Sequence, residues 1–209
     1  QLVQRQQHRI VLVRDANGRR LGAVMADDLL GYHQSSSAML LRELGQAESA
    51  SELARLRKRL PELLDPLLRG GAKPRMLTRV VSAVSDAISR RVIELALAER
   101  GPAPRPFAFV ALGSQGREEQ TLWTDQDNAI LFADGDEDPS VARWFLELGD
   151  VVCADLARIG YVECPGGTMA RNPHCNQSLG GWKRDFTKWI RKASPQDLLA
   201  VNIVFDFRL

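Results

Sequence analysis

Two aspartates at the start of an apolar segment offer the clearest chemistry in the sequence. Asp125 and Asp127 lie two residues apart. In an extended strand this spacing puts both side chains on one face, with Cα atoms roughly 6.5 Å apart. Neighbouring carboxylates repel each other unless one is protonated or a cation lies between them. Mg²⁺ is the natural cation, because it prefers carboxylate oxygens together with substrate phosphates. Taken alone, the pair is more typical of an exposed strand edge.

A glycine–serine turn precedes this pair. Gly113 and Ser114 follow the continuous apolar run 107–112, which predicts a buried strand. Glycine lets backbone N–H groups approach a ligand closely, and a helix beginning at this turn would favour an anion at its N-terminus. Ser114 adds a hydroxyl group, and Arg117 adds a planar guanidinium suited to phosphate. Without the aspartates, the segment would indicate only a turn.

A third carboxylate lies near the end of the sequence. Asp206 interrupts the apolar run 201–207, which otherwise predicts a core strand. A charged side chain is rarely buried without a partner, so Asp206 needs an ion pair or a metal. The sequence leaves two interpretations open. Asp206 pairs with Arg208, or it lies beside Asp125 and Asp127 on a neighbouring strand.

The cysteines do not indicate a second site. The chain has three, Cys153, Cys164 and Cys175, and the sequence shows no basic-then-apolar pattern that would predict a leader. An odd number without a leader predicts free thiols in a reducing cytoplasm. Cys164, His174 and Cys175 lack zinc-site spacing and a fourth ligand, so no zinc site is predicted. The adjacent His174 and Cys175 do not predict a nucleophile–base pair either.

The composition is that of a globular protein with a hydrophobic core. Of its 209 residues, 44% are hydrophobic and 26% are charged. A net charge of +2 gives no reason to expect nucleic-acid binding or an anionic membrane surface. No apolar run is long enough to cross a bilayer. Because the sequence begins with Gln1 and ends within an apolar run, we expect both ends to be cuts in a longer protein.

The first hundred residues predict a hairpin followed by helices. Two strand patterns flank turn residues within 8–25, and Asp27 can cap a helix that follows. Three further helices are predicted, at 38–44, 51–70 and 77–95. Pro61 predicts a kink or break in the second. The third carries an apolar stripe at helical spacing, which predicts a side that faces the core.

The rest of the chain predicts a small mixed sheet with helices, so the predicted fold class is α+β. Strands are predicted at 107–112, 127–132, 161–163 and 200–207. Helices are predicted at 141–159, 178–192 and from Ser194, with a short helix or turn at 118–123. Residues 165–176 are polar and contain glycine, which predicts a loop.

The segment 113–128 resembles the G-S-x-x-R-x-E-x-x-x-x-[ST]-D-x-D signature of the DNA polymerase beta-like nucleotidyltransferase superfamily. The residues of this segment are similar to those of a bacterial family of CBS-linked nucleotidyltransferases, which are related to the protein-PII uridylyltransferases. Residues 166–173 and 205–208 also resemble that family, and the likeness covers roughly residues 50 to 209. Residues 22–29 resemble the closing segment of a CBS module.

The resemblance implies an organisation and a set of site residues. Residues 1–32 would be a CBS remnant, 33–100 a helical linker or bundle, and 101–209 a truncated nucleotidyltransferase core. The implied metal ligands and catalytic residues are Asp125, Asp127 and Asp206, with Mg²⁺ or Mn²⁺ as cofactor. The implied phosphate-binding residues are Gly113, Ser114 and Arg117, where Arg117 could equally brace the motif.

The implied function is transfer of a nucleoside monophosphate from an NTP to an unidentified acceptor, which could be a protein, in a cytoplasmic signalling enzyme. We expect neither a nucleic-acid partner nor a membrane, and the CBS and helical regions offer a surface for self-association. The main alternative is a non-catalytic module that senses nucleotide and keeps a vestigial transferase site. A third interpretation, an antitoxin-like partner resembling minimal nucleotidyltransferases, fits the CBS-like segment and the helical linker less well.

Overall fold

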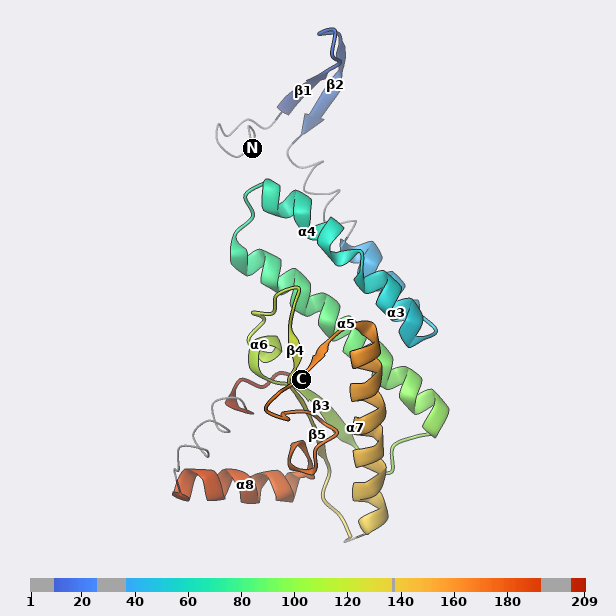
Figure 1. Cartoon of the computed structure of the whole chain (residues 1–209), viewed down its shortest axis with the longest axis vertical. Coiled ribbons are helices and arrows are strands. Elements are labelled where there is room, and N and C mark those ends of the chain that lie inside the picture. The colour runs from blue at the N-terminus through green and yellow to red at the C-terminus, as the bar shows by residue number, and fades with distance from the viewer. Residues whose placement is uncertain (1–9, 26–36, 137, 193–203) are drawn as a thin grey trace.

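The computed structural model describes residues 10–25, 37–136, 138–192 and 204–209 (Figure 1). The predicted cap at Asp27, the helix from Ser194 and most of the strand 200–207 lie outside these residues. None of the helices within the described ranges is long and apolar enough to cross a membrane.

The N-terminal hairpin is confirmed. Strand β1 (Ile10–Arg14) pairs antiparallel with β2 (Arg20–Met25). The turn closes because the Asp15 carboxylate accepts the backbone N–H groups of Asn17 at 2.9 Å and Arg19 at 2.8 Å. Gly18 supplies the left-handed backbone that the turn requires, with φ of +82°.

The predicted helix 51–70 is two helices, α3 (Ala50–Arg57) and α4 (Leu60–Arg69), and residues 37–46 form another before them. The break comes before Pro61, which lies in the first turn of α4, where its missing N–H has no helical partner to lose. Helix α3 begins earlier than predicted, because Ser49 caps it by accepting the N–H of Glu52 at 3.2 Å.

The long helix α5 (Pro74–Arg100) buries the predicted apolar stripe, including Val81, Val84, Ile88 and Val92. It also buries three serines along its length, Ser82, Ser85 and Ser89. Such small side chains let neighbouring backbone approach a helix closely. Helix α5 ends at Gly101, whose φ of +88° favours glycine.

A mixed sheet of three strands confirms the α+β class. Its order is β3 (Phe107–Ala111), β5 (Asn128–Phe132), β7 (Asn176–Ser178). The first pair is antiparallel and the second parallel. A separate parallel pair joins β4 (Asp125–Gln126) to β6 (Val162–Glu163). The remaining elements are α6 (Gly113–Gly116), α7 (Pro139–Ile159), the 3₁₀ turn η1 (Pro173–Cys175) and α8 (Leu179–Lys192).

The prediction of a short helix or turn at 118–123 is met by its second alternative, since these residues contain a turn and a bend, and the short helix α6 comes before them, directly after β3. Two sequence predictions need correction. Strand β7 lies at the end of the predicted loop, because its polar residues pair with the buried strand β5. Residues 204–205 are helical, and among residues 204–209 only Arg208 pairs with a strand, at Ala111.

The sheet is covered on both faces, which explains why β3 and β5 are almost continuously apolar. Alternate residues such as Phe107 and Ile130 join a core shared with helices α3, α5 and α7. The others, such as Val110 and Ala129, join a smaller cluster with Trp182 of α8. Figure 1 shows these long helices around the strands.

Phe145 of α7 lies at the centre of the larger core. Its side chain is fully buried, and its ring stacks on Phe132 with centroids 4.5 Å apart. The ring of Phe107 lies 5.4 Å away. This aromatic group joins α7 to the sheet that carries the candidate site.

We expect Phe145→Ala to lower the free energy of unfolding by about 3–5 kcal/mol, because it leaves a cavity in a close-packed core. Trp123→Ala is the control, since that large aromatic is 86% exposed, and it should change stability by about 0.5 kcal/mol or less. Urea unfolding measures both. Equal losses in the two variants would show that the aromatic core does not hold the sheet to α7.

Candidate active site

The structure brings Asp125 and Asp127 together, as the sequence predicts. Asp125 begins β4, and Asp127 occupies the single position between β4 and β5. Each offers a carboxylate oxygen, and these oxygens and the Sγ atom of Cys164 all lie within 4.8 Å of one another. All three residues are half-buried. We call this group the carboxylate–thiol cluster.

The environment of the cluster opposes a charge on Asp127. Burial raises the pKa of the Asp127 carboxyl group above its usual value, and the nearby charge of Asp125 adds to this. A hydrogen bond from Cys164 and the positive charge of Arg117 act in the opposite direction. Burial also raises the pKa of the Cys164 thiol, and the charge of Asp127 raises it further. The thiol therefore stays protonated and donates to Asp127.

The turn after β3 touches Asp127 directly. Gly113 has φ of +53°, and a Cβ atom there would lie 2.5 Å from Oδ2 of Asp127. The backbone N–H of Leu112 donates to the carbonyl oxygen of Asp127 at 2.9 Å. Only glycine meets both demands at this position, a left-handed backbone and no side chain against the carboxylate.

Ser114 lies behind this contact. Its Oγ atom is 3.5 Å from Oγ1 of Thr124, the residue that precedes Asp125. The amide of the buried Gln120 lies at the same distance from that hydroxyl group. Ser114 thus contacts Thr124, the residue before Asp125, whereas Gly113 lies against Asp127 itself.

Arg117 joins the motif to the end of the described chain. Its Nε atom donates to Glu119 at 2.8 Å, and its Nη1 atom forms an ion pair with Asp206. The hydrogen bonds that Arg117 donates to these two carboxylates raise its pKa. Arg117 therefore braces two carboxylates in this structure, and it also acts on Asp127 by charge.

Asp206 takes neither of the places that the sequence left open. Its partner is Arg117, whereas Arg208 pairs with Asp86 of α5. Among the described residues, its carboxylate does not belong to the cluster of ligand atoms within 4.8 Å. It nevertheless lies beside the motif. A Cβ atom at Gly116 would overlap the backbone carbonyl of Asp206, so Gly116 is required for this contact.

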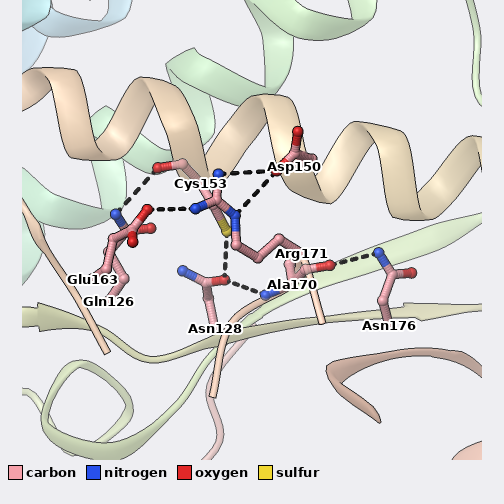
Figure 2. Close-up of polar contacts among 8 residues, drawn as sticks. All are labelled: Gln126, Asn128, Asp150, Cys153, Glu163, Ala170, Arg171 and Asn176. Carbon is pink, nitrogen blue, oxygen red and sulfur yellow. Dashed lines mark hydrogen bonds and ion pairs between the residues drawn. The ribbon is translucent and has the colours of Figure 1, made fainter. Parts of the chain in front are cut away.

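Cys164 was missed as a neighbour of the aspartates, and the loop that carries it is held from several sides (Figure 2). The side-chain oxygen of Asn128 accepts the N–H of Ala170 at 2.8 Å, and the Asn128 N–H donates to Thr168 at 3.0 Å. The amide of Asn176 donates to the carbonyl of Ala170 at 2.8 Å. These asparagines occupy buried positions on β5 and β7, which is the signal that could have marked them.

Arg171 ties the same loop to the helix above it. It forms ion pairs with Asp150 of α7, at 2.9 Å, and with Glu163 of β6 (Figure 2). Helix α7 approaches closely because Gly149 has no side chain, and a Cβ atom there would overlap the carbonyl of Ala170. The loop is therefore anchored on both sides of Cys164, and its thiol is held beside Asp127.

Among the described residues, Cys164 belongs to the one group of possible metal ligands, and that group includes neither His174 nor Cys175. All three cysteines are free thiols, as predicted. Burial raises the pKa of Cys153 and of Cys175 to about 11. Neither is activated as a nucleophile.

The donor set of the cluster fits a divalent cation. Two half-buried carboxylates supply the oxygen ligands that Mg²⁺ and Mn²⁺ prefer. A cation between them would offset the burial and the neighbouring charge that raise the pKa of Asp127. Cys164 is protonated beside Asp127, and only a thiolate binds a metal, so the two carboxylates are the expected ligands.

One protein family matches most of the chain. The family described as "Putative nucleotidyltransferase DUF294" matches residues 58–196. The chain belongs to this family. The match includes the glycine turn, both aspartates and Cys164, and it ends before Asp206. No curated protein matches the chain. Membership of this family supports nucleotidyl transfer as the general activity of the domain. The predicted CBS linkage and the relation to protein-PII uridylyltransferases stay predictions.

We expect Gly113→Ala to weaken Mn²⁺ binding at least about tenfold, because its methyl group would displace the Asp127 carboxylate. Gly101→Ala is the matched control. Gly101 also has a positive φ, +88°, but a Cβ atom there meets nothing within 4 Å. Titration calorimetry with Mn²⁺ should therefore separate backbone strain, common to both, from displacement of Asp127. An unchanged affinity in Gly113→Ala would contradict the proposed contact.

In metal-free protein, we expect Asp127→Asn to be more stable than the native chain at neutral pH. The folded-state pKa of Asp127 is raised, so its stabilising contribution is present below the ordinary value of 3.8 and is lost as the pH rises through the folded pKa. The advantage of the variant should therefore disappear on acidification, as measured by urea unfolding with a chelator present.

Asp138→Asn tests the sign of this effect. Hydrogen bonds from Ser140 lower the pKa of Asp138, so its contribution is present above the ordinary value and is lost as the pH falls. This variant should be less stable than the native chain at neutral pH and equal to it in acid. The same pH trend in both variants would contradict the assigned environments.

Proposed function

We propose that this protein transfers a nucleoside monophosphate from an NTP to an acceptor hydroxyl group, with Asp125 and Asp127 as ligands of a divalent cation. One observation carries the proposal. In a chain that belongs to a nucleotidyltransferase family, carboxylate oxygens of Asp125 and Asp127 lie within 4.8 Å of each other, against the side-chain-free turn at Gly113.

The reaction would proceed by attack of the acceptor oxygen on the α-phosphorus. The new bond is between that oxygen and the α-phosphorus, and the broken bond is the one from the α-phosphorus to the bridging oxygen. Pyrophosphate leaves with the bond electrons, and the hydroxyl proton passes to a carboxylate or to water. A bound Mg²⁺ or Mn²⁺ would neutralise phosphate charge and lower the pKa of the attacking hydroxyl group.

The residues of the turn would hold the triphosphate. Gly113 leaves room for phosphate oxygens to approach the backbone, and Ser114 offers a hydroxyl group. Arg117 is suited to phosphate, because its guanidinium is planar and already lies near Asp127. A phosphate bound there would compete with Asp206 for Arg117. Asp206 would then be free to serve as the third carboxylate and to accept the proton.

The finer parts of the proposal concern the acceptor and the surroundings of the site. A protein acceptor, as for the protein-PII uridylyltransferases, follows from the resemblance of residues 113–128. The resemblance also supports a CBS remnant at 1–32, a helical region at 33–100 and a transferase core at 101–209, in a cytoplasmic signalling protein. Self-association would use the CBS or helical region.

One observation favours the alternative, a nucleotide sensor with a vestigial site. The carboxylate of Asp206 is bound by Arg117 and lies outside the carboxylate–thiol cluster. A site with only two carboxylates could bind a metal–nucleotide complex without deprotonating an acceptor. The sensor and the enzyme therefore differ in turnover, not in binding.

Incubation of the intact protein with each labelled NTP, Mn²⁺ or Mg²⁺, and cell extract tests the proposal. We expect labelled acceptor with the native chain, and at least about a hundredfold less with Asp125→Asn or Asp127→Asn, since loss of a metal ligand removes several kcal/mol of transition-state stabilisation. Asp136→Asn is the control, because this exposed aspartate lies outside the cluster and should leave transfer unchanged.

Two outcomes would contradict the enzyme. Binding of an NTP that needs Asp125 and Asp127, with no label transferred under any condition, would establish the sensor. Transfer that persists in both variants would place the chemistry elsewhere in the protein.

A further inference from the structure

Helix α5 reaches the candidate site through one aspartate, Asp86. Its Oδ2 atom accepts Nη1 of Arg208 at 2.5 Å, and its Oδ1 atom accepts Nη2 of the same residue at 2.9 Å. Oδ1 also accepts the side-chain amide of Gln115 at 3.0 Å. A bidentate arginine–carboxylate pair fixes the orientation of the two side chains as well as their distance. Asp86 therefore orients one residue of the glycine turn and one residue of the C-terminal segment at once.

Arg208 is held from the other sides as well. Its Nη2 atom donates to the carbonyl of Gln115 at 3.0 Å, and its backbone exchanges two hydrogen bonds of 2.9 Å with Ala111. The hydrogen bonds with Asp86 are the main reason that the pKa of Arg208 is raised. Within the described chain, no other carboxylate pairs with this guanidinium.

The same two segments are joined again, two residues away from the first contact on each segment. Arg117 lies two residues after Gln115, Asp206 lies two residues before Arg208, and these two form an ion pair. The glycine turn and the C-terminal segment are thus connected by the Arg117–Asp206 ion pair and by the hydrogen bond from Arg208 to the Gln115 carbonyl. Asp86 holds Arg208 through a second ion pair, which is more buried than the first. Its side chain is 24% exposed and that of Arg208 is 29% exposed.

The small side chains around Asp86 let neighbouring segments pack close to helix α5. The buried Ser82, Ser85 and Ser89 lie on its sides, and Ser85 accepts the hydroxyl group of Tyr161 at 3.0 Å. Arg79, seven residues before Asp86 and so on the same face, pairs with Glu118 at 3.0 Å. Glu118 follows Arg117 and has φ of +58°, a conformation that needs such support.

We infer that Asp86 is a positioning residue for the proposed transferase, and that it acts through Arg208 and Gln115 to set where Asp206 meets Arg117. The inference rests on the proposed function. Asp125, Asp127 and Cys164 are held by β4, β5 and the loop anchored by Asn128 and Arg171, whereas the hydrogen bonds of Asp86 go to Arg208 and Gln115. Loss of Asp86 should therefore disturb the third carboxylate and spare the metal ligands.

The test is Asp86→Asn in the intact protein, which removes the charge and keeps the size of the side chain. We expect kcat to fall about tenfold to a hundredfold, with the KM for the NTP changed by less than about threefold and Mn²⁺ affinity unchanged. The double variant with Arg208→Gln should lose no more than Asp86→Asn alone, because both residues act as one unit.

Asp155→Asn is the matched control. Asp155 is 20% exposed and pairs with Arg158 at 2.8 Å on α7, away from the glycine turn. The chemical change and the burial are therefore similar, and only the contacts differ. This variant should keep the kcat, KM and Mn²⁺ affinity of the native chain.

Hydrogen exchange of the Ala111 and Arg208 amides gives a readout that needs no turnover. These amides bond to each other's carbonyl groups, so Asp86→Asn should speed their exchange and Asp155→Asn should not. If the native chain transfers nothing, the proposed function fails, and faster exchange would still establish the tie to Asp86. Unchanged exchange would overturn the inference. So would a fall in kcat accompanied by an equal loss of Mn²⁺ binding, because Asp86 would then support the whole site.

Discussion

Two glycines in one short turn make room for two aspartates from distant parts of the chain. Gly113 lies against the carboxylate of Asp127, and Gly116 lies against the backbone of Asp206. A side chain at either position would push one of these segments away. The turn itself follows directly from β3, whose residues pack against the core shared with α7 on one side and the cluster with Trp182 of α8 on the other. The sheet therefore positions the turn, and the turn sets the distance between the aspartates and the groups that we propose to bind phosphate.

This close packing has an electrostatic consequence. Asp127 is partly withdrawn from water and lies beside Asp125, which raises its pKa, while Arg117 opposes that effect. A fold selected for stability alone would avoid two carboxylates in this place. Their arrangement is unfavourable without a cation, and it would become favourable with the cation and the triphosphate that we propose. Arg117 has the central position. Its positive charge lowers the pKa of Asp127, its side chain binds Asp206, and its guanidinium is suited to phosphate.

Much of this could be predicted from local sequence, and the rest could not, for a physical reason. The spacing of Asp125 and Asp127 and the glycine after an apolar run are local features, so the pair and the turn were predicted. Cys164 lies beside them only because the loop 164–172 folds back under α7. The partner of Asp206 also depends on tertiary packing: Arg208 is nearer in sequence, but its backbone pairing with Ala111 turns its side chain to Asp86.

A crystal structure with Mn²⁺ and an NTP analogue that cannot be cleaved at the α-phosphate would test the central claim most directly. Anomalous scattering locates the manganese without ambiguity. We expect a manganese peak bonded to both Asp125 and Asp127, with the β- and γ-phosphates against the backbone of Gly113 and Ser114. A nucleotide bound at another surface, or manganese absent from the two aspartates while the nucleotide is present, would contradict the account.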